Sequence, residues 1–125
     1  MPKKVFVVED DQAIGALIAM VLKYEGYEVI LARDYQQVPD SVAESRPDVV
    51  LIDSPHARGY GPAWELALSV RQKDSSIPML MLTGHAQDAT EVRMTDHGKL
   101  CITAIPKPFD IDNLVSQVQA ITRDN

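Results

Sequence analysis

A short apolar run that ends in a carboxylate constrains this sequence more than any other feature. Residues 49–52, Val-Val-Leu-Ile, contain no polar residue, and Asp53 follows them directly. An uninterrupted apolar run of this length is typical of a strand buried on both faces, as in parallel sheets covered by helices. Ligands of open parallel sheets bind beyond the carboxyl ends of the strands, where Asp53 would lie. Taken alone, Asp53 fits a turn equally well, because Asp-Ser-Pro is also good turn chemistry.

Four more apolar runs resemble this one, and segments with helical periodicity separate them. The predicted strands are residues 5–8, 29–32, 49–52, 79–82 and 101–105. The predicted helices carry apolar side chains three and four residues apart: Ile14, Leu17, Ile18, Val21 and Leu22; Val38, Val42 and Ala43; Ala63, Leu66, Ala67 and Val70; Ile111, Leu114, Val115 and Val118. A more polar helix is expected over residues 88–97. Asp11 is the predicted N-cap of the first helix and Gly26 its terminator. Such alternation predicts an α/β fold, a parallel sheet with helices on both faces.

Length and composition indicate one globular domain over residues 1–125, with 46% hydrophobic and 24% charged residues. The net charge is −6 and the only basic run is Lys3-Lys4, which argues against direct binding of nucleic acid. The single cysteine, Cys101, excludes an internal disulfide and a cysteine metal cluster, and it suits a reducing cytoplasm. No apolar stretch approaches the ~20 residues of a membrane helix. We therefore expect a cytoplasmic domain without membrane contact, and no effector domain within these residues.

Polar side chains follow four of the five predicted strands. Glu9 and Asp10 follow the first, Asp53 the third, Thr83 the fourth and Lys107 the fifth. The carboxyl ends of parallel strands share one edge of the sheet, so these side chains are expected to gather there. Three neighbouring carboxylates repel one another unless a cation intervenes, and Mg²⁺ is the best candidate because it uses a few carboxylates and keeps waters. Together with an ammonium and a hydroxyl group, such a site suits phosphoryl transfer.

Over essentially its whole length, the chain resembles the receiver domains of two-component response regulators. The resemblance rests on Val7-Val8-Glu9-Asp10-Asp11, Asp53 at the end of the third strand, Thr83-Gly84 and Lys107-Pro108-Phe109. It implies the flavodoxin-like, doubly wound fold, with a five-stranded parallel sheet in the order 2-1-3-4-5 and five helices. It also implies that Asp53 accepts a phosphoryl group from the phosphohistidine of a sensor histidine kinase or a phosphotransfer protein. Phosphorylation would then switch interactions with a downstream effector domain or protein.

The same resemblance assigns roles to the other residues of the site. Asp10 would bind Mg²⁺ directly and Glu9 directly or through water, with an oxygen of Asp53 and the backbone carbonyl of Pro55 as further ligands. Lys107 would pair with the phosphoryl group, Thr83 would donate a hydrogen bond to it in the active state, and the Lys107–Pro108 peptide bond would be cis. A chain of this kind is not an enzyme beyond self-catalysed phosphotransfer and autodephosphorylation.

The sequence departs from the usual receiver pattern in three ways. Ala104 stands where most members carry an aromatic residue, three positions before the lysine. His56-Ala57 replaces the common Met-Pro, and Pro106 directly precedes Lys107. Because alanine has no rotamer to change, we expect phosphorylation to alter residues 53–60 and 83–90 while leaving residues 102–105 nearly unchanged.

Two alternative functions remain open. A pseudo-receiver would keep the fold as an interaction module that does not depend on phosphate; Ala104 favours it, whereas the intact acids, Thr83 and Lys107 oppose it. A haloacid-dehalogenase-like phosphatase also uses a strand-end aspartate with Mg²⁺, but it needs a second acid two residues later, where Pro55 stands. A flavodoxin is disfavoured, because acids follow the first strand where a phosphate-binding loop would be required.

The remaining distinctive residues have simpler interpretations. His85, two residues after Thr83, either controls access of water to the phosphoryl group or is an ordinary surface histidine. His56 and His97 are expected to face solvent without binding metal, because no second ligand has a suitable spacing. Trp64 is expected to pack, and Cys101 to be a small buried hydrophobic residue.

Overall fold

The computed structural model describes residues 3–9, 11–32, 37–53, 61–73, 77–83, 102–106 and 110–122, with only the backbone described at 61–65, 68, 83 and 102–106. The elements, in chain order, are β1 (Lys4–Val8), α1 (Gln12–Tyr24), β2 (Glu28–Ala32), α2 (Val38–Ser45), β3 (Val49–Asp53), α3 (Gly61–Lys73), β4 (Met79–Thr83), β5 (Ile102–Pro106) and α5 (Ile111–Thr122).

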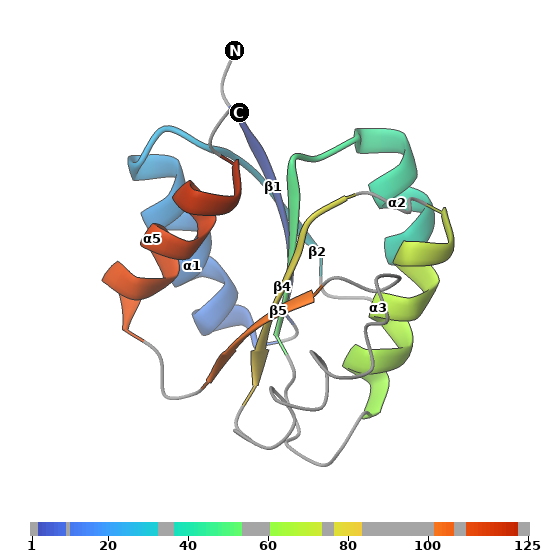
Figure 1. Cartoon of the computed structure of the whole chain (residues 1–125). Coiled ribbons are helices and arrows are strands. Elements are labelled where there is room, and N and C mark those ends of the chain that lie inside the picture. Colours follow the sequence, from blue (N-terminus) through green and yellow to red (C-terminus); the bar gives the residue numbers. More distant parts are fainter. Residues whose placement is uncertain are drawn as a thin grey trace.

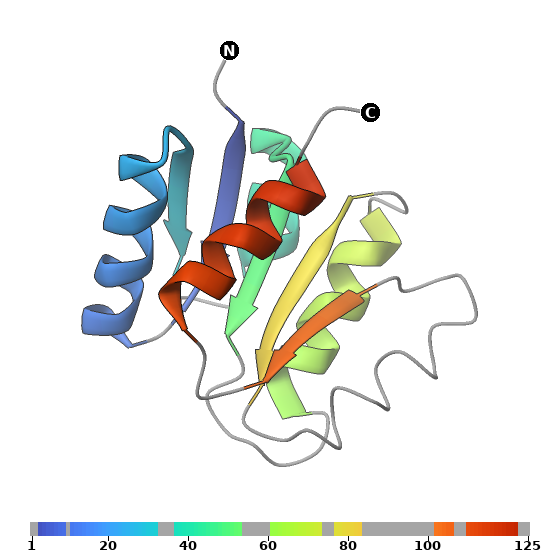
Figure 2. The ribbon, with the colours of Figure 1, turned by 60° about the vertical axis from the view of Figure 1, so that its left-hand side comes forward.

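The strands form one sheet in the order β2-β1-β3-β4-β5, and every neighbouring pair is parallel. The arrowheads in Figure 2 therefore point toward the same edge. The strand order reverses between β1 and β3, which is the point where flavodoxin-like folds bind their ligands. The predicted α/β, flavodoxin-like architecture is confirmed.

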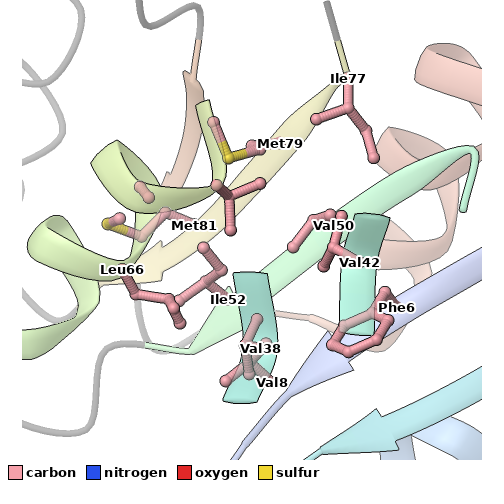
Figure 3. Close-up of a cluster of buried hydrophobic side chains, with 12 residues drawn as sticks. Phe6, Val8, Val38, Val42, Val50, Ile52, Leu66, Ile77, Met79 and Met81 are labelled. Atoms are coloured by element: carbon pink, nitrogen blue, oxygen red, sulfur yellow. The ribbon is translucent and has the colours of Figure 1, made fainter. Parts of the chain in front are cut away.

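The helices cover both faces of the sheet. In Figure 1, α1 and α5 lie on one face, and α2 and α3 on the other. Alternate residues of the central strands enter separate cores: Phe6 and Ile52 pack with α2 and α3 (Figure 3), and Val7 and Leu51 with α1 and α5. This alternation follows from the two-residue period of a strand. All five residues of β3 are buried, which explains its uninterrupted apolar sequence.

The ends of α1 lie at the residues that the sequence predicted. The carboxylate of Asp11 accepts a hydrogen bond from the N–H of Ile14 at 3.0 Å and caps the first turn. Gly26, just beyond the helix, has a φ of +99°, a conformation that glycine adopts easily. The N–H of Tyr27 donates to the carbonyl of Leu22 at 3.0 Å, which completes the Schellman type of helix end.

The buried face of α1 differs from the predicted one. Ile18 and Leu22 are buried as expected, but Ile14 and Leu17 are 38% and 44% exposed. A glycine, Gly15, faces the sheet instead. Apolar residues surround much of this helix, so their spacing alone did not determine which side would pack.

The end of α2 is joined to the start of the sheet. The ammonium group of Lys4 donates to the carbonyl of Ser45 in the last turn of α2 at 2.9 Å, and the backbone N–H of Lys4 donates to the carboxylate of Asp48 at 2.7 Å. The first contact satisfies a carbonyl that has no partner within the helix. Arg46 ends the helix in a left-handed conformation, with φ 50° and ψ 61°.

Several further features of the helices and of β5 bear on the predictions. Ala43 is exposed and does not belong to the buried side of α2. Pro106 is the last residue of β5, which is tolerated because β5 lies at the edge of the sheet. Four helices are present in the described ranges, and the helix predicted over residues 88–97 lies outside them. Within those same ranges, no helix has both the length and the apolar character needed to cross a membrane.

Arg46→Gly is expected to raise the free energy of unfolding by about 0.5 kcal/mol. A left-handed conformation costs a non-glycine residue about 1 kcal/mol, and part of the gain is lost to the greater freedom of glycine in the unfolded chain. Urea denaturation measures the change. Arg46→Ala, which keeps the unfavourable conformation, is the control, and equal stabilities of the two variants would contradict the prediction.

Candidate functional site

The two central strands bring two acidic residues to the same edge of the sheet. β1 and β3 are paired in register up to Val8 and Ile52. Glu9 and Asp53 each follow these paired residues by one position, so they lie at the carboxyl ends of two adjacent strands. The structure thus brings together two of the three predicted acids.

Glu9 is held by its backbone and by its side chain. Its N–H donates to the carbonyl of Ala32, the last residue of β2, at 3.0 Å. Its Oε2 atom accepts a hydrogen bond from the N–H of Asp11 at 3.0 Å. The residue is 1% exposed and its Oε1 atom is buried. The carboxylate of Glu9 is therefore fixed between the end of β1 and the start of α1.

Asp53 is the last residue of β3 and is paired in register with Leu82 of β4. It is 3% exposed, and its Oδ1 atom is buried. An ionised carboxylate is costly to bury unless it is paired, hydrogen-bonded or bound to a metal ion. Two buried carboxylates on neighbouring strands supply the oxygen donors that a hard divalent cation prefers.

Asp11 has a structural role, as the sequence analysis favoured. Its carboxylate caps α1 through Ile14, and the residue is exposed. Its backbone N–H, rather than its side chain, contacts the acidic site through Glu9. Asp11 therefore connects the start of α1 to the site without presenting its own carboxylate there.

The other predicted site residues are only partly covered. Thr83 is the last residue of β4 and is paired with Pro106, which places its backbone at the same edge; its side chain is outside the description. Asp10, Pro55 and Lys107 lie outside the described residues. So do His56, His85, His97 and Cys101, and the side chains of Trp64 and Ala104. Among the described residues, no group of three or more His, Cys, Asp or Glu could hold a metal ion, and the three-acid site remains a prediction.

Exposed apolar side chains on α1 were missed by the sequence analysis. Ile14, Leu17, Met20 and Tyr24 are 38%, 44%, 62% and 88% exposed. Spacings of three and four residues place them along one side of the helix, and we call them the α1 apolar surface. It begins in the first turn of α1, near Glu9. The sequence contained a signal for this surface, because α1 has more large apolar residues than one buried face requires.

The sequence as a whole matches one protein family. Residues 5–119 match the response regulator receiver domain. The chain is 32% identical over 123 residues to the response regulator MprA of Mycolicibacterium vanbaalenii, covering 98% of this chain and 52% of that protein. It is 29% identical over 123 residues to the phosphate regulon transcriptional regulatory protein PhoB of Escherichia coli, covering 98% and 53%. The chain thus spans about half the length of these curated relatives.

Solved structures agree with this match. The chemotaxis response regulator CheY4 of Vibrio cholerae superimposes with a TM-score of 0.77 at 25% identity, covering 97% of this chain and 99% of that one. A CheY-like receiver domain protein from Methanospirillum hungatei gives a TM-score of 0.80 at 22% identity, covering 96% and 93%, and shows the same fold. The fold and the strand-edge carboxylates define a receiver-type α/β domain. The chain belongs to the response regulator receiver domain family.

Proposed function

We propose that residues 1–125 act as a single phosphoacceptor domain in two-component signalling. Asp53 receives a phosphoryl group from the phosphohistidine of a sensor histidine kinase or a phosphotransfer protein. The observation that carries this proposal is the pair of buried carboxylates, Glu9 and Asp53, on adjacent strands at the carboxyl edge of a receiver fold.

In the proposed reaction, a carboxylate oxygen of Asp53 attacks the phosphorus atom. An O–P bond forms, the P–N bond to the donor imidazole breaks, and the imidazole leaves with the electron pair of that bond and takes up a proton. The transition state carries negative charge on the phosphoryl oxygens, so cations and hydrogen-bond donors near them lower the barrier. Lys107 and Thr83 are the residues that we assign to these roles.

The described acids fit a Mg²⁺ ion. Carboxylate oxygens are its preferred protein ligands, and both Glu9 and Asp53 have a buried oxygen at the site. Asp10 and the carbonyl of Pro55 complete the proposed ligand set. When bound, Mg²⁺ would neutralise charge that otherwise opposes the approach of a phosphoryl group.

The location and partners of the chain belong to the same proposal. A kinase donor and a single cysteine, Cys101, suit the reducing environment of the cytoplasm. The net charge of −6 supports our expectation that these 125 residues do not themselves bind nucleic acid. PhoB is a transcriptional regulatory protein about twice as long as this chain. A transcriptional output here would therefore require a further effector domain or a partner protein.

The pseudo-receiver is the second candidate, and Ala104 is the observation that favours it. The residue lies in β5, in register with Met81. A pseudo-receiver would bind its partner equally well with and without phosphorylation. Phosphatase activity like that of the haloacid dehalogenases has less support, because the chain belongs to the receiver family and Pro55 occupies the position of the second acid.

We also propose that the donor protein docks on the α1 apolar surface. A phosphohistidine can reach Asp53 only if its protein contacts the carboxyl edge of the sheet. The α1 apolar surface starts beside that edge, and exposed apolar groups of this kind often mark protein interfaces. A small phosphodonor needs no such contact, which allows the two steps to be tested separately.

Mg²⁺ is expected to raise the free energy of unfolding, by about 2.7 kcal/mol at a concentration 100 times its Kd. Thermal unfolding with increasing Mg²⁺ measures this gain. Glu9→Gln and Asp53→Asn are expected to lose most of it. Asp11→Asn is the matched control, because it removes one nearby charge but keeps a good N-cap. Equal losses in all three variants would show a general charge effect instead of a binding site.

Incubation with phosphoramidate and Mg²⁺ is expected to add one phosphoryl group to the wild-type protein, detected by intact mass and localised by peptide mass spectrometry. Asp53→Asn should remain unmodified, because an amide is a poor nucleophile. Asp11→Asn, which changes an exposed acid, should be modified normally. Modification that persists in Asp53→Asn would show that the phosphoacceptor has been wrongly assigned.

Leu17→Ser is expected to slow phosphotransfer from a protein donor about tenfold, the loss typical of one important interface residue. The donor would be the fastest of a panel of purified, phosphorylated histidine kinases. The rate with phosphoramidate should not change. Ala43→Ser, an exposed position on the opposite face of the sheet, is the control. If Leu17→Ser slowed both donors equally, the residue would act on the site and not on docking.

A further inference from the structure

Gly15 lies buried in the second turn of α1, and its backbone conformation does not require glycine. Its N–H donates to the carbonyl of Asp11 at 2.9 Å, as in any helix. Among the described glycines, only Gly26 has a positive φ. A glycine within a helix costs about 1 kcal/mol relative to alanine. A side chain at position 15 would therefore act through contacts with its neighbours, and not through strain in the backbone.

That space is bounded by the acidic site. A Cβ atom at position 15 would lie 3.4 Å from Cγ of Glu9, and 3.2 Å and 3.4 Å from the two Cδ atoms of Leu31. The Leu31 atoms are the end of a flexible, half-buried side chain and can move aside. The side chain of Glu9 has less freedom. The backbone N–H of Glu9 donates a hydrogen bond to the carbonyl of Ala32, and its carboxylate accepts one from the N–H of Asp11.

We propose that Gly15 is a positioning residue for the acidic site, and that its lack of a side chain sets the affinity for Mg²⁺ through Glu9. The inference rests on the proposed Mg²⁺ site. A methyl group at position 15 would contact the aliphatic part of the Glu9 side chain. A larger group would displace that side chain. Displacement of Glu9 would break the hydrogen bond from the N–H of Asp11 or shift the buried Oε1 atom of Glu9.

The variants Gly15→Ala and Gly15→Val distinguish an effect on Mg²⁺ affinity from an effect on folding stability. The alanine variant gains helix propensity, so its stability without Mg²⁺ should equal or exceed that of the wild type. We expect its affinity for Mg²⁺, measured by calorimetric titration, to fall several-fold. For valine the loss should reach about tenfold or more, the range found when groups that orient metal ligands are changed.

Two controls identify the contact responsible. Ala16→Gly changes the exposed neighbouring position, and it should lower stability by about 1 kcal/mol without changing Mg²⁺ affinity. Gly15→Ala combined with Leu31→Val removes the crowding at Leu31 and leaves the contact with Glu9. If the loss of affinity persists in this double variant, it arises through Glu9, as proposed. If the double variant binds Mg²⁺ like Leu31→Val alone, the effect arises through Leu31 and the inference is wrong.

The outcomes also separate this inference from the proposed function. A wild-type protein that fails to bind Mg²⁺ would overturn the proposed site, and the inference with it. A wild-type protein that binds Mg²⁺, together with a folded Gly15→Ala variant of unchanged affinity, would overturn the inference alone. Should Gly15→Val not fold, the alanine and double variants still decide.

Discussion

The parallel pairing of β1 with β3 is the contact on which the candidate site depends. These strands are neighbours in the sheet, although the α1 helix, β2 and α2 separate them in the sequence. Their common direction and register place Glu9 beside Asp53 at one edge. The hydrophobic cores on both faces hold this pairing in place. Apolar burial elsewhere in the sheet thus fixes the backbone positions of the two acids at one edge.

The start of α1 connects this edge to the protein surface. Through Asp11, the first turn of the helix is hydrogen-bonded to the carboxylate of Glu9. Gly15 lets the same helix lie close to Glu9, while Ile14 and Leu17 remain exposed on another side. One helix therefore supports the acidic site, and presents the surface on which we propose that a phosphodonor docks. Phosphoryl transfer needs both, because the donor must be placed before the chemistry can occur.

The family match and the structure support different parts of the proposal. The match over residues 5–119 identifies a receiver domain, and it is independent of any side-chain position. The structure adds that Glu9 and Asp53 are each buried, and that they lie at the carboxyl ends of two adjacent strands. Asp10, Pro55, Lys107 and the side chain of Thr83 enter the proposal through their places in the sequence alone.

Much of the fold and of the site could be predicted from local patterns. Continuous apolar runs predicted the positions of the five strands. The runs of the central strands β1 and β3 are buried, and a strand covered on both faces has no solvent-facing position for a polar residue. Asp11 and Gly26 marked the ends of α1, because helix capping depends on neighbouring residues in the chain. The order of acids after the strands indicated the edge on which Asp53 lies. Each of these features depends either on residues close together in the sequence or on the common direction of all the strands.

The buried side of α1 and the restraints on Glu9 could not be predicted in the same way. Ile14 and Leu17 follow helical spacing as well as Ile18 and Leu22 do, yet only the second pair is buried. The choice depends on contacts between the helix and the rest of the fold, such as the close approach of Gly15 to Leu31 and Glu9. By itself, the sequence determined the class of fold and the ends of α1, and it predicted the chemical groups of the site. Only the tertiary structure decided which face of α1 packs and how Glu9 is held, because both depend on contacts between elements that no local pattern encodes.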